Sequence, residues 1–266
     1  MTGSDSNFGD EMQLSIITIH LNNFTGLEKT LESLRPVLGI KQVEWIVVDG
    51  GSDLENDKRE TLTHARSLAA HFISKPDNGI YDAMNKGTQL ATGEFVLYMN
   101  AGDGLHPDFQ YEKLVATPFT NEEAMIWGRY DVRDSNESVY SRRTRHPGWL
   151  RYGTAVCHQA VFFKRSVLGS TPYNTDLSIA ADYDLICRLY THGEKINMLN
   201  MPVCIFDLVG ESGKDKRLTL REESIIRRTY FPITSIFNGL IFSFKLLLWH
   251  LGTLMPSFRR AWSRYF

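Results

Sequence analysis

The chain has 266 residues, of which 42% are hydrophobic and 23% are charged, and its net charge is −2. This composition is typical of a globular protein with a sizeable core and excludes a mainly disordered chain. The near-neutral charge argues against a general nucleic-acid-binding protein, so we expect no nucleic-acid partner. Three widely separated cysteines and a polar N-terminus indicate neither a disulfide framework nor a secretory signal, and we expect a cytoplasmic protein.

The first hundred residues alternate between short apolar runs and helical patterns. Strands are predicted at 14–19, 43–48, 72–73 and 95–99, and the intervening helices at 27–38, 62–72 and 80–91. Continuous apolar strands separated by helices favour a parallel sheet that is covered on both faces. In such sheets ligands bind outside the carboxyl ends of the strands, so we expect the chemistry in the residues that follow each strand.

The second half of the chain is less regular. Residues 127–145 are polar and rich in turn formers, whereas 160–163 reads as a strand and 179–189 as an amphipathic helix. Residues 196–208 have the length and composition of one or two strands. We therefore divide the chain into a main domain at 12–213 and a C-terminal helical region at 214–266.

The C-terminal region combines an apolar stretch with a basic end. Residues 233–255 are strongly apolar but contain Lys245, and Arg259, Arg260 and Arg264 follow among aromatic residues. From residue 211 onward there are ten Lys and Arg against four Asp and Glu. A lysine near the middle of the apolar stretch disfavours a spanning helix, so we expect a helix that lies on a membrane surface. Packing on the main domain, or on a second copy in a homodimer, is the alternative.

Polar residues follow the first two strands. His20 to Asn23 come after one strand, and Asp49 to Asp53 come after the next. Glycines in the second loop allow a ligand to approach the backbone closely, although a simple turn that caps the next helix explains the same residues. The fingerprints of dinucleotide-binding and P-loop proteins are absent from the sequence.

The third and fourth loops carry more polar groups. Asp82, Asn85 and Lys86 share a short span at the start of a helix, where Asp82 and Asn85 can line a pocket and Lys86 can attract phosphate. The fourth loop places Asn100 and Asp103 directly after an apolar strand. Such oxygen donors suit Mg²⁺ or Mn²⁺, so we expect a divalent cation as cofactor.

These loops together resemble a known family. The stretches that carry the resemblance are Ser15 to Thr18 with Asn22, Trp45 to Ser52, Pro76 to Gly87, Ala91 to Glu94, Asn100 to Asp103 and Ala181 to Asp184. They are similar to the family 2 glycosyltransferases, and in particular to the colanic-acid-type enzymes that build bacterial surface polysaccharides. The resemblance implies an α/β fold of GT-A type, namely a Rossmann-like nucleotide-sugar-binding domain with a mixed central sheet, followed here by a C-terminal helical appendage.

The resemblance also implies roles for single residues. It places Thr18 and Asn22 in the first nucleotide-contacting loop, Asp49 at the base, Asn100 at the ribose and Asp103 at the metal. Along the nucleoside and sugar it places Asp77, Gly79, Asp82, Asn85 and Lys86. Asn100 and Gly102 stand where many members have Asp, so one metal-organising carboxylate is missing.

Asp182 matches the catalytic base of the family, with Ala181 where a Glu is usual. A carboxylate is needed there to take the proton of an attacking hydroxyl, whereas a first-turn helix acid is the simpler interpretation. Asp184 is a second candidate for the base. His158 and Gln159 are expected on the acceptor side, or else as a satisfied buried pair.

Taken together, these features predict an inverting glycosyltransferase. It would transfer a sugar from a UDP or GDP sugar to a hydroxyl of a saccharide acceptor linked to a polyprenyl diphosphate, at the cytoplasmic face of the inner membrane. The alternatives are a non-catalytic scaffold subunit that binds a nucleotide sugar, and a nucleotidyltransferase.

Overall fold

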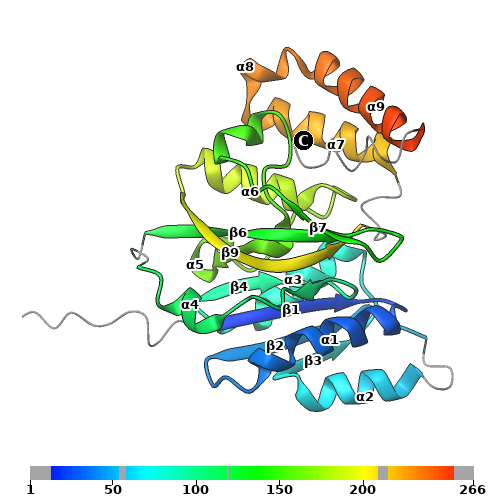
Figure 1. Ribbon diagram of the computed structural model, residues 1–266, viewed down its shortest axis with the longest axis vertical. Helices are drawn as coiled ribbons and strands as arrows, with labels where there is room; N and C mark the ends of the chain where they lie inside the picture. The colour runs from blue at the N-terminus through cyan, green and yellow to red at the C-terminus, as the bar shows by residue number, and fades with distance from the viewer. Residues whose placement is uncertain (1–12, 54–57, 119, 121, 209–214, 255–266) are drawn as a thin grey trace, which may run out of the picture.

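A single mixed sheet runs through the computed structural model, which describes residues 13–53, 58–118, 120, 122–208 and 215–254 (Figure 1). Within these residues the strand order is β3-β2-β1-β4-β8-β6-β9-β5, and β7 pairs with β6 at one side. Strands β1 to β4 are mutually parallel, whereas β8 runs antiparallel to both β4 and β6. The mixed α/β fold of GT-A type, with helices at the C-terminal end, is therefore confirmed.

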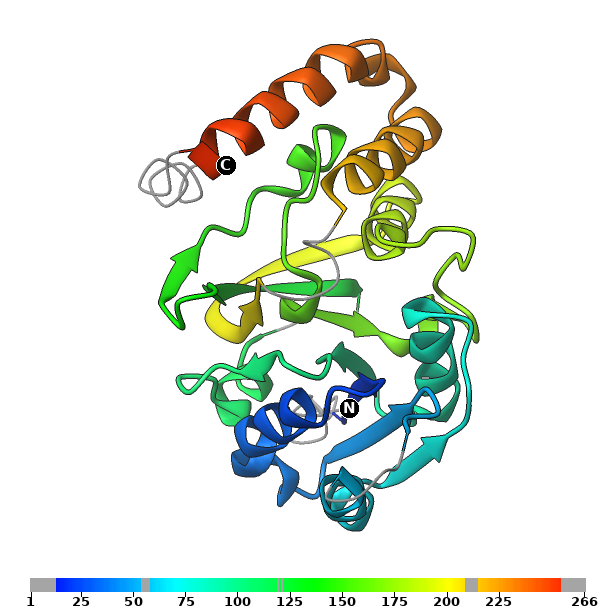
Figure 2. The same cartoon turned by 90° about the vertical axis from the view of Figure 1, so that its right-hand side faces the viewer.

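The N-terminal half follows the predicted alternation closely. Its elements are β1 (Leu14–His20), α1 (Phe24–Leu38), β2 (Val43–Asp49), α2 (Lys58–Leu68), β3 (His71–Ser74), α3 (Ile80–Leu90), β4 (Phe95–Tyr98), β5 (Gly104–Leu105) and α4 (Tyr111–Val115). Every residue of β1 and β4 is buried, which explains their continuous apolar character. Figure 2 shows α1 and α3 on opposite faces of the sheet, and the Gly87 backbone of α3 packs closely on Ile17 of β1.

The second half contains β6 (Glu123–Arg133), β7 (Val139–Arg142), a 3₁₀ turn (His158–Ala160), β8 (Val161–Lys164), α5 (Arg165–Leu168), α6 (Ala181–Thr191) and β9 (Lys195–Asp207). The interpretation of 127–145 as merely polar and turn-rich was wrong, because most of it belongs to β6 and β7. Strand β6 pairs with β9 on one side, and on the other side with β8 in its first half and with β7 in its second half. Its backbone is therefore paired on both sides although its second half carries polar side chains. Residues 196–208 form one long strand rather than two.

Three helices end the described chain: α7 (Lys216–Tyr230), α8 (Pro232–Ser235) and α9 (Asn238–Leu254). Helix α7 packs on α6, and α9 packs back on α7, away from the sheet (Figures 1 and 2). No helix among the described residues is both long and apolar enough to cross a membrane. The basic residues Arg259, Arg260 and Arg264 lie outside the described residues, and the domain division at 213/214 stays a prediction.

Candidate active site

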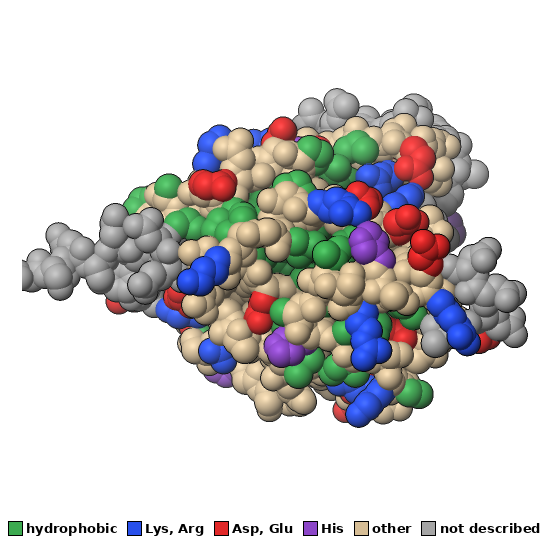
Figure 3. All heavy atoms as spheres, turned by 90° about the horizontal axis from the view of Figure 1, so that it is seen from below, with side chains coloured by type: hydrophobic (Ala, Val, Ile, Leu, Met, Phe, Trp, Pro, Cys, Tyr) green, Lys and Arg blue, Asp and Glu red, His purple; other side chains and the backbone are tan. Residues whose placement is uncertain are grey.

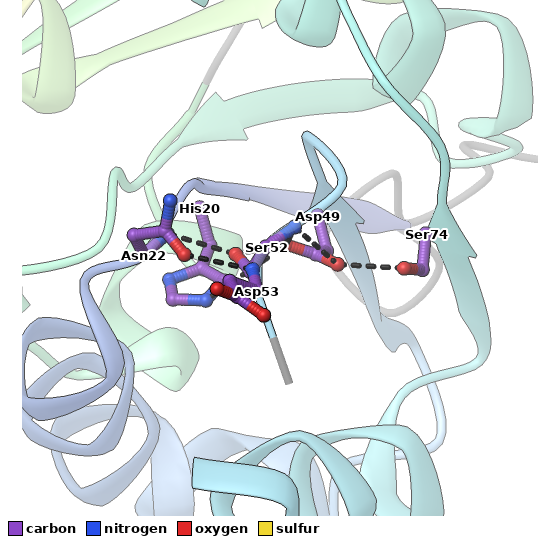
Figure 4. Close-up of polar contacts among 6 residues, drawn as sticks. All are labelled: His20, Asn22, Asp49, Ser52, Asp53 and Ser74. Atoms are coloured by element: carbon purple, nitrogen blue, oxygen red, sulfur yellow. Dashed lines mark hydrogen bonds and ion pairs between the residues drawn. The ribbon is translucent and has the colours of Figure 1, made fainter. Parts of the chain in front are cut away.

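The carboxyl ends of β1, β2 and β3 meet around the buried carboxylate of Asp49 (Figure 4). This carboxylate accepts hydrogen bonds from the Ser52 hydroxyl at 2.5 Å and from the Ser74 hydroxyl at 2.6 Å. The His20 ring lies 3.9 Å from the same carboxylate. Asp49 therefore stands at the predicted edge of the sheet, where it joins the loops that follow β2 and β3.

The first two loops are held together by reciprocal contacts. The backbone N–H of Asn22 donates to the Ser52 hydroxyl at 2.8 Å, and the Asn22 side chain accepts from the Asp53 N–H at 2.9 Å (Figure 4). Asn22 has a φ of 51°, an uncommon conformation that asparagine tolerates better than most residues. The exposed Asn22 thus lies at this edge of the sheet, against the second loop, and its contact with a nucleotide stays a prediction.

Thr18 lies inside the sheet instead. Its side chain is fully buried and its hydroxyl accepts a hydrogen bond from the Trp45 indole N–H at 2.9 Å. This contact satisfies a buried donor between β1 and β2. The placement gives Thr18 a packing role, and a direct contact with a nucleotide does not follow from it.

The third loop turns sharply into α3. Gly79 adopts a φ of +110°, which favours glycine, and its N–H donates to the Asp77 carboxylate at 2.9 Å. The other carboxylate oxygen of Asp77 lies so close to Gly50 that a Cβ there would sit 2.3 Å from it. This close approach brings the second and third loops together at the same edge.

Two charged residues of α3 pair with each other. The Lys86 ammonium lies 2.9 Å from the Asp82 carboxylate and also donates to the Pro76 carbonyl. The Asn78 N–H and Lys86 lower the pKa of Asp82. Both side chains keep partial exposure, so they remain able to face a ligand.

Asn85, in contrast, joins two parts of the protein. Its side-chain amide donates to the Tyr173 carbonyl at 3.0 Å and accepts from the Tyr173 N–H at 2.9 Å. It is 5% exposed, so these bonds fill a buried position. The polar groups of Asn85 are thereby used to fix the segment before α6 on α3.

The fourth loop holds a buried carboxylate and, three residues before it, a buried amide oxygen. Asp103 accepts from the Asp207 N–H at 2.9 Å and is hydrogen-bonded by the Gln159 side chain. Burial raises the pKa of Asp103 to about 7. The side-chain oxygen of Asn100 is buried and has no hydrogen-bond partner.

This donor set fits a divalent cation that is held mainly by its substrate. Among the described residues no three His, Cys, Asp or Glu side chains gather as a metal cluster. Mg²⁺, however, is commonly bound by one or two carboxylates together with substrate phosphates, and a cation would offset the penalty on a buried carboxylate. Asp103, with the unpartnered oxygen of Asn100, suits that mode of binding.

Asp182 lies in the first turn of α6 and contacts α3. The Tyr81 hydroxyl is 3.4 Å from the Asp182 carboxylate and donates to the Ile179 carbonyl at 2.6 Å. The same Asp182 oxygen accepts from the Tyr183 N–H at 2.8 Å. Burial raises the pKa of Asp182 to about 6, so at neutral pH it is an ionised and comparatively strong base. Tyr81 thus links this candidate base to the third loop.

The residues expected on the acceptor side are buried. His158 is 4% exposed, its Nε2 lies 2.7 Å from the Tyr173 hydroxyl, and burial lowers its pKa to about 3. Gln159 lies against Asp103. These contacts favour the alternative of a buried pair for both side chains, although the Nδ1 of His158 has no hydrogen-bond partner among the described residues.

Asp184 is also buried and is hydrogen-bonded by Tyr230 of α7. Burial raises its pKa. Since its carboxylate is engaged by the C-terminal helices, Asp182 is the better placed of the two candidate bases.

Sequence reasoning missed Tyr81, Ser74 and Glu222. Tyr81 lies within the recognised stretch 76–87 and Ser74 ends the strand before it, so the sequence could have indicated that both lie near this edge of the sheet. The contact of Tyr81 with Asp182 joins residues 101 positions apart and has no local signal. Glu222 lies 40 residues after Asp182 in sequence, and its carboxylate accepts three backbone N–H groups just before α6. No local pattern indicates such a long-range contact.

Comparisons with known proteins establish the class. The model of the glycosyl transferase family 2 matches residues 15–177, which include the four loops. An uncharacterized glycosyltransferase of Mycobacterium tuberculosis is 31% identical over 205 residues, which cover 74% of this chain and 76% of that protein. A PGL/p-HBAD biosynthesis glycosyltransferase of Mycobacterium bovis is 30% identical over 198 residues, with 67% and 70% of the two chains covered. The chain belongs to glycosyltransferase family 2, a family of enzymes.

Solved structures share the fold at low sequence identity. Staphylococcus aureus TarS in complex with UDP-GlcNAc aligns with a TM-score of 0.59 and 15% identity over 91% of this chain and 73% of that chain. The mannosyltransferase PcManGT of Pyrobaculum calidifontis, in complex with GDP-Man and Mn²⁺, aligns with a TM-score of 0.54 and 17% identity over 84% and 62%. The relatives named above are mycobacterial, so the resemblance to the colanic-acid branch stays a prediction.

Proposed function

We propose that the protein is an inverting glycosyltransferase that moves a sugar from a UDP or GDP sugar to a hydroxyl of a lipid-linked saccharide acceptor. The observation that carries this proposal is the position of Asp182. It is a carboxylate with a raised pKa that contacts Tyr81, directly beside the loop predicted to bind the donor. The donors named for TarS and PcManGT and the glycolipid pathway named for the Mycobacterium bovis relative support the substrate classes.

In the proposed reaction Asp182 takes the proton of the acceptor hydroxyl. The acceptor oxygen forms a bond to the anomeric carbon while the bond from that carbon to the diphosphate oxygen breaks, and the nucleoside diphosphate leaves. A single displacement inverts the configuration at the anomeric carbon. A divalent cation, when bound, would neutralise charge on the leaving diphosphate, and Asp103 with Asn100 would hold it.

The donor would lie along the edge formed by the first three loops. Asp49 is the expected contact for the base, and the Asp49 carboxylate already fixes the loops around it through Ser52 and Ser74. Lys86 supplies positive charge beside the path of the diphosphate, balanced in the free protein by Asp82. Asp77, Asn22 and Gly79 complete the predicted lining.

The test is a transfer assay on the full-length protein with a panel of UDP and GDP sugars, Mn²⁺ and a polyprenyl-diphosphate-linked saccharide. We expect release of the nucleoside diphosphate and a product whose anomeric configuration, read by NMR, is opposite to that of the donor. Retention of configuration, or nucleotide-sugar binding without turnover across the panel, would contradict the proposal.

We also propose that α8 and α9 dock on an anionic membrane surface. These two helices and the turn between them expose six large apolar side chains, at 50% to 82% of their area: Ile233, Ile236, Phe237, Leu240, Phe244 and Leu247. No Asp or Glu follows Glu223 in the sequence, and Lys245, the one charged residue of α9, is turned toward Glu223. An apolar face in a basic, acid-free segment matches anionic lipid headgroups above an acyl layer.

The opposite end of the molecule differs. On the face shown in Figure 3, acidic and basic side chains of the described residues are interspersed among hydrophobic and other side chains. Six of the twelve exposed large apolar side chains of the described residues lie instead in the C-terminal stretch of α8 and α9. Docking there would bring a lipid-linked acceptor close to the enzyme.

Sedimentation with liposomes tests this surface. We expect the protein to sediment with vesicles that contain phosphatidylglycerol, less with pure phosphatidylcholine, and not at all when Ile236 and Leu240 are both changed to Glu. The double variant should keep its turnover of a water-soluble acceptor. A concentration-dependent dimer that is lost in the double variant, without liposome binding by the wild type, would show that the face binds a second copy instead.

A further inference from the structure

The segment that leads into Asp182 is held by a carboxylate from the C-terminal helices. Glu222 of α7 accepts hydrogen bonds from the backbone N–H groups of Ser178, Ile179 and Ala180, each at 2.9 Å. Its side chain is 6% exposed. Three successive N–H groups that converge on one buried anion form a charge-assisted contact, which is stronger and better defined than neutral hydrogen bonds.

The sequence of α6 explains why an outside acceptor is needed. Helix α6 begins at Ala181, and its N-cap residue Ala180 has no side-chain oxygen to accept a backbone N–H. The residues that lead into the helix have no intrahelical acceptor either, and backbone N–H groups that are removed from water need partners. Glu222 supplies the acceptor for the N–H groups of 178–180, directly before the helix and two positions ahead of Asp182.

The same segment is held from its other side by α3. The Tyr81 hydroxyl donates to the Ile179 carbonyl at 2.6 Å and lies 3.4 Å from Asp182. Residues 178–180 are therefore held between a carboxylate that accepts hydrogen bonds from their N–H groups and a hydroxyl that donates a hydrogen bond to one of their carbonyls. Because Asp182 is two residues further on, the orientation of its carboxylate depends on these contacts.

Ion pairs of the neighbouring residue hold helix α7 in place beside Glu222. The neighbouring carboxylate of Glu223 lies 3.1 Å from Arg227 and 2.5 Å from Lys245 of α9. Arg227 also donates to Asn238 at 2.8 Å. The cations of this cluster are paired with Glu223, which leaves the Glu222 carboxylate committed to the backbone of 178–180.

We infer that Glu222 is a positioning residue, which holds the loop 178–180 so that Asp182 meets the acceptor hydroxyl. The inference rests on the proposed role of Asp182 as the base. It assigns to the C-terminal region a part in catalysis besides membrane docking. Displacing a catalytic carboxylate by about 1 Å can lower the reaction rate roughly 100-fold, since proton transfer requires that the donor and acceptor lie within hydrogen-bond distance.

The experiment compares Glu222→Gln and Glu222→Ala with the wild type and with Glu60→Gln, which makes the same change on the exposed first turn of the remote helix α2. We expect Glu222→Ala to lower kcat by about 10- to 100-fold, with the donor KM and the UDP affinity within about 2-fold. Glu222→Gln keeps the shape and one acceptor oxygen, so its loss of kcat should be smaller. Glu60→Gln should behave as the wild type.

Hydrogen exchange gives a reading that does not depend on turnover. The amides of 178–180 should exchange faster in both Glu222 variants, while peptides from β1 to β4 keep their wild-type protection. Wild-type kcat in Glu222→Ala, or unchanged exchange at 178–180, would overturn the inference. A parallel fall of kcat, UDP affinity and unfolding midpoint in both variants would also overturn it, because it would show a purely structural role.

The two proposals fail in different ways. If the wild type turns over no nucleotide sugar, the proposed function fails, and the exchange data still decide whether Glu222 holds the loop. If the wild type is active and the Glu222 variants match it, only the positioning role is lost.

Discussion

Replacing Asp182 by Asn removes a partly buried negative charge and should stabilise the protein above neutral pH. Burial raises the pKa of Asp182 to about 6 from its ordinary 3.8. The folded protein therefore holds this proton between those two pH values, where the unfolded chain has released it. The free energy of unfolding of the wild type consequently decreases as the pH rises through this window. The variant lacks this decrease, because its amide does not titrate.

The size of the effect follows from the two pKa values. Their difference lowers the free energy of unfolding of the wild type by roughly 3 kcal/mol at pH values where Asp182 is ionised in both the folded and the unfolded protein. At pH 5 about half of this loss has occurred. Asp182 is partly exposed, so water offsets some of the penalty and about 1 to 3 kcal/mol is expected at pH 8. The amide oxygen of Asn can still accept from the Tyr183 N–H, so no other contact needs to be lost.

The assay is urea unfolding of the wild type and of Asp182→Asn at pH 5 and pH 8, without nucleotide and with a chelator. The variant should be the more stable protein at pH 8, and its advantage should shrink at pH 5. Asp176→Asn, at an exposed position in the same region, should show no such pH-dependent difference. A variant that is less stable than the wild type at pH 8 would refute the reasoning. A difference between the free energies of unfolding of the two proteins that is the same at both pH values would refute it as well.

Three further predictions concern residues with other expected roles. Asn85→Ala should lower the free energy of unfolding by roughly 2 to 4 kcal/mol, because it leaves both backbone groups of Tyr173 unpaired in a buried position. Urea unfolding measures this loss. A raised donor KM at unchanged stability would show a sugar contact instead. Thr18→Val should lower the free energy of unfolding by about 1 to 3 kcal/mol, because it leaves the Trp45 N–H without its acceptor. Calorimetry should find the wild-type affinity for UDP. Weaker UDP binding without a loss of stability would contradict the packing role. Dialysis against EDTA should abolish turnover, and Mn²⁺ should restore it. The Mn²⁺ concentration required should be about 10-fold higher for Asp103→Asn than for the wild type. Full turnover by the metal-free enzyme would contradict this prediction.

The N-terminal half of the fold was predictable because its strands are buried on both faces. Leu14–His20 and Phe95–Tyr98 read as apolar runs, and parallel strands place their following loops at one edge. The position of Asp49 at that edge therefore follows from the sequence pattern, and the structure shows it there. Strand β6 was not predictable in the same way, since Arg129 and Asp131 interrupt its apolar pattern although its backbone pairs on both sides.

The candidate site was predictable in its loops but not in the use made of each side chain. The motif around Asn85 indicates polar contacts, yet this amide pairs with the Tyr173 backbone and not with an open pocket. Thr18 belongs to a recognised motif, but its hydroxyl accepts a hydrogen bond from the Trp45 indole N–H. Glu222 carries no signal in its own neighbourhood, because its partners lie more than 40 residues away and are backbone groups. Such roles depend on which elements pack together in space.

The most direct test of the proposed mechanism is the turnover of Asp182→Asn in the transfer assay. If Asp182 is the base, this variant should bind UDP with Mn²⁺ within about 2-fold of the wild-type affinity, and its kcat should fall by about 100-fold or more. Transfer at the wild-type rate by a correctly folded Asp182→Asn would show that another group takes the proton.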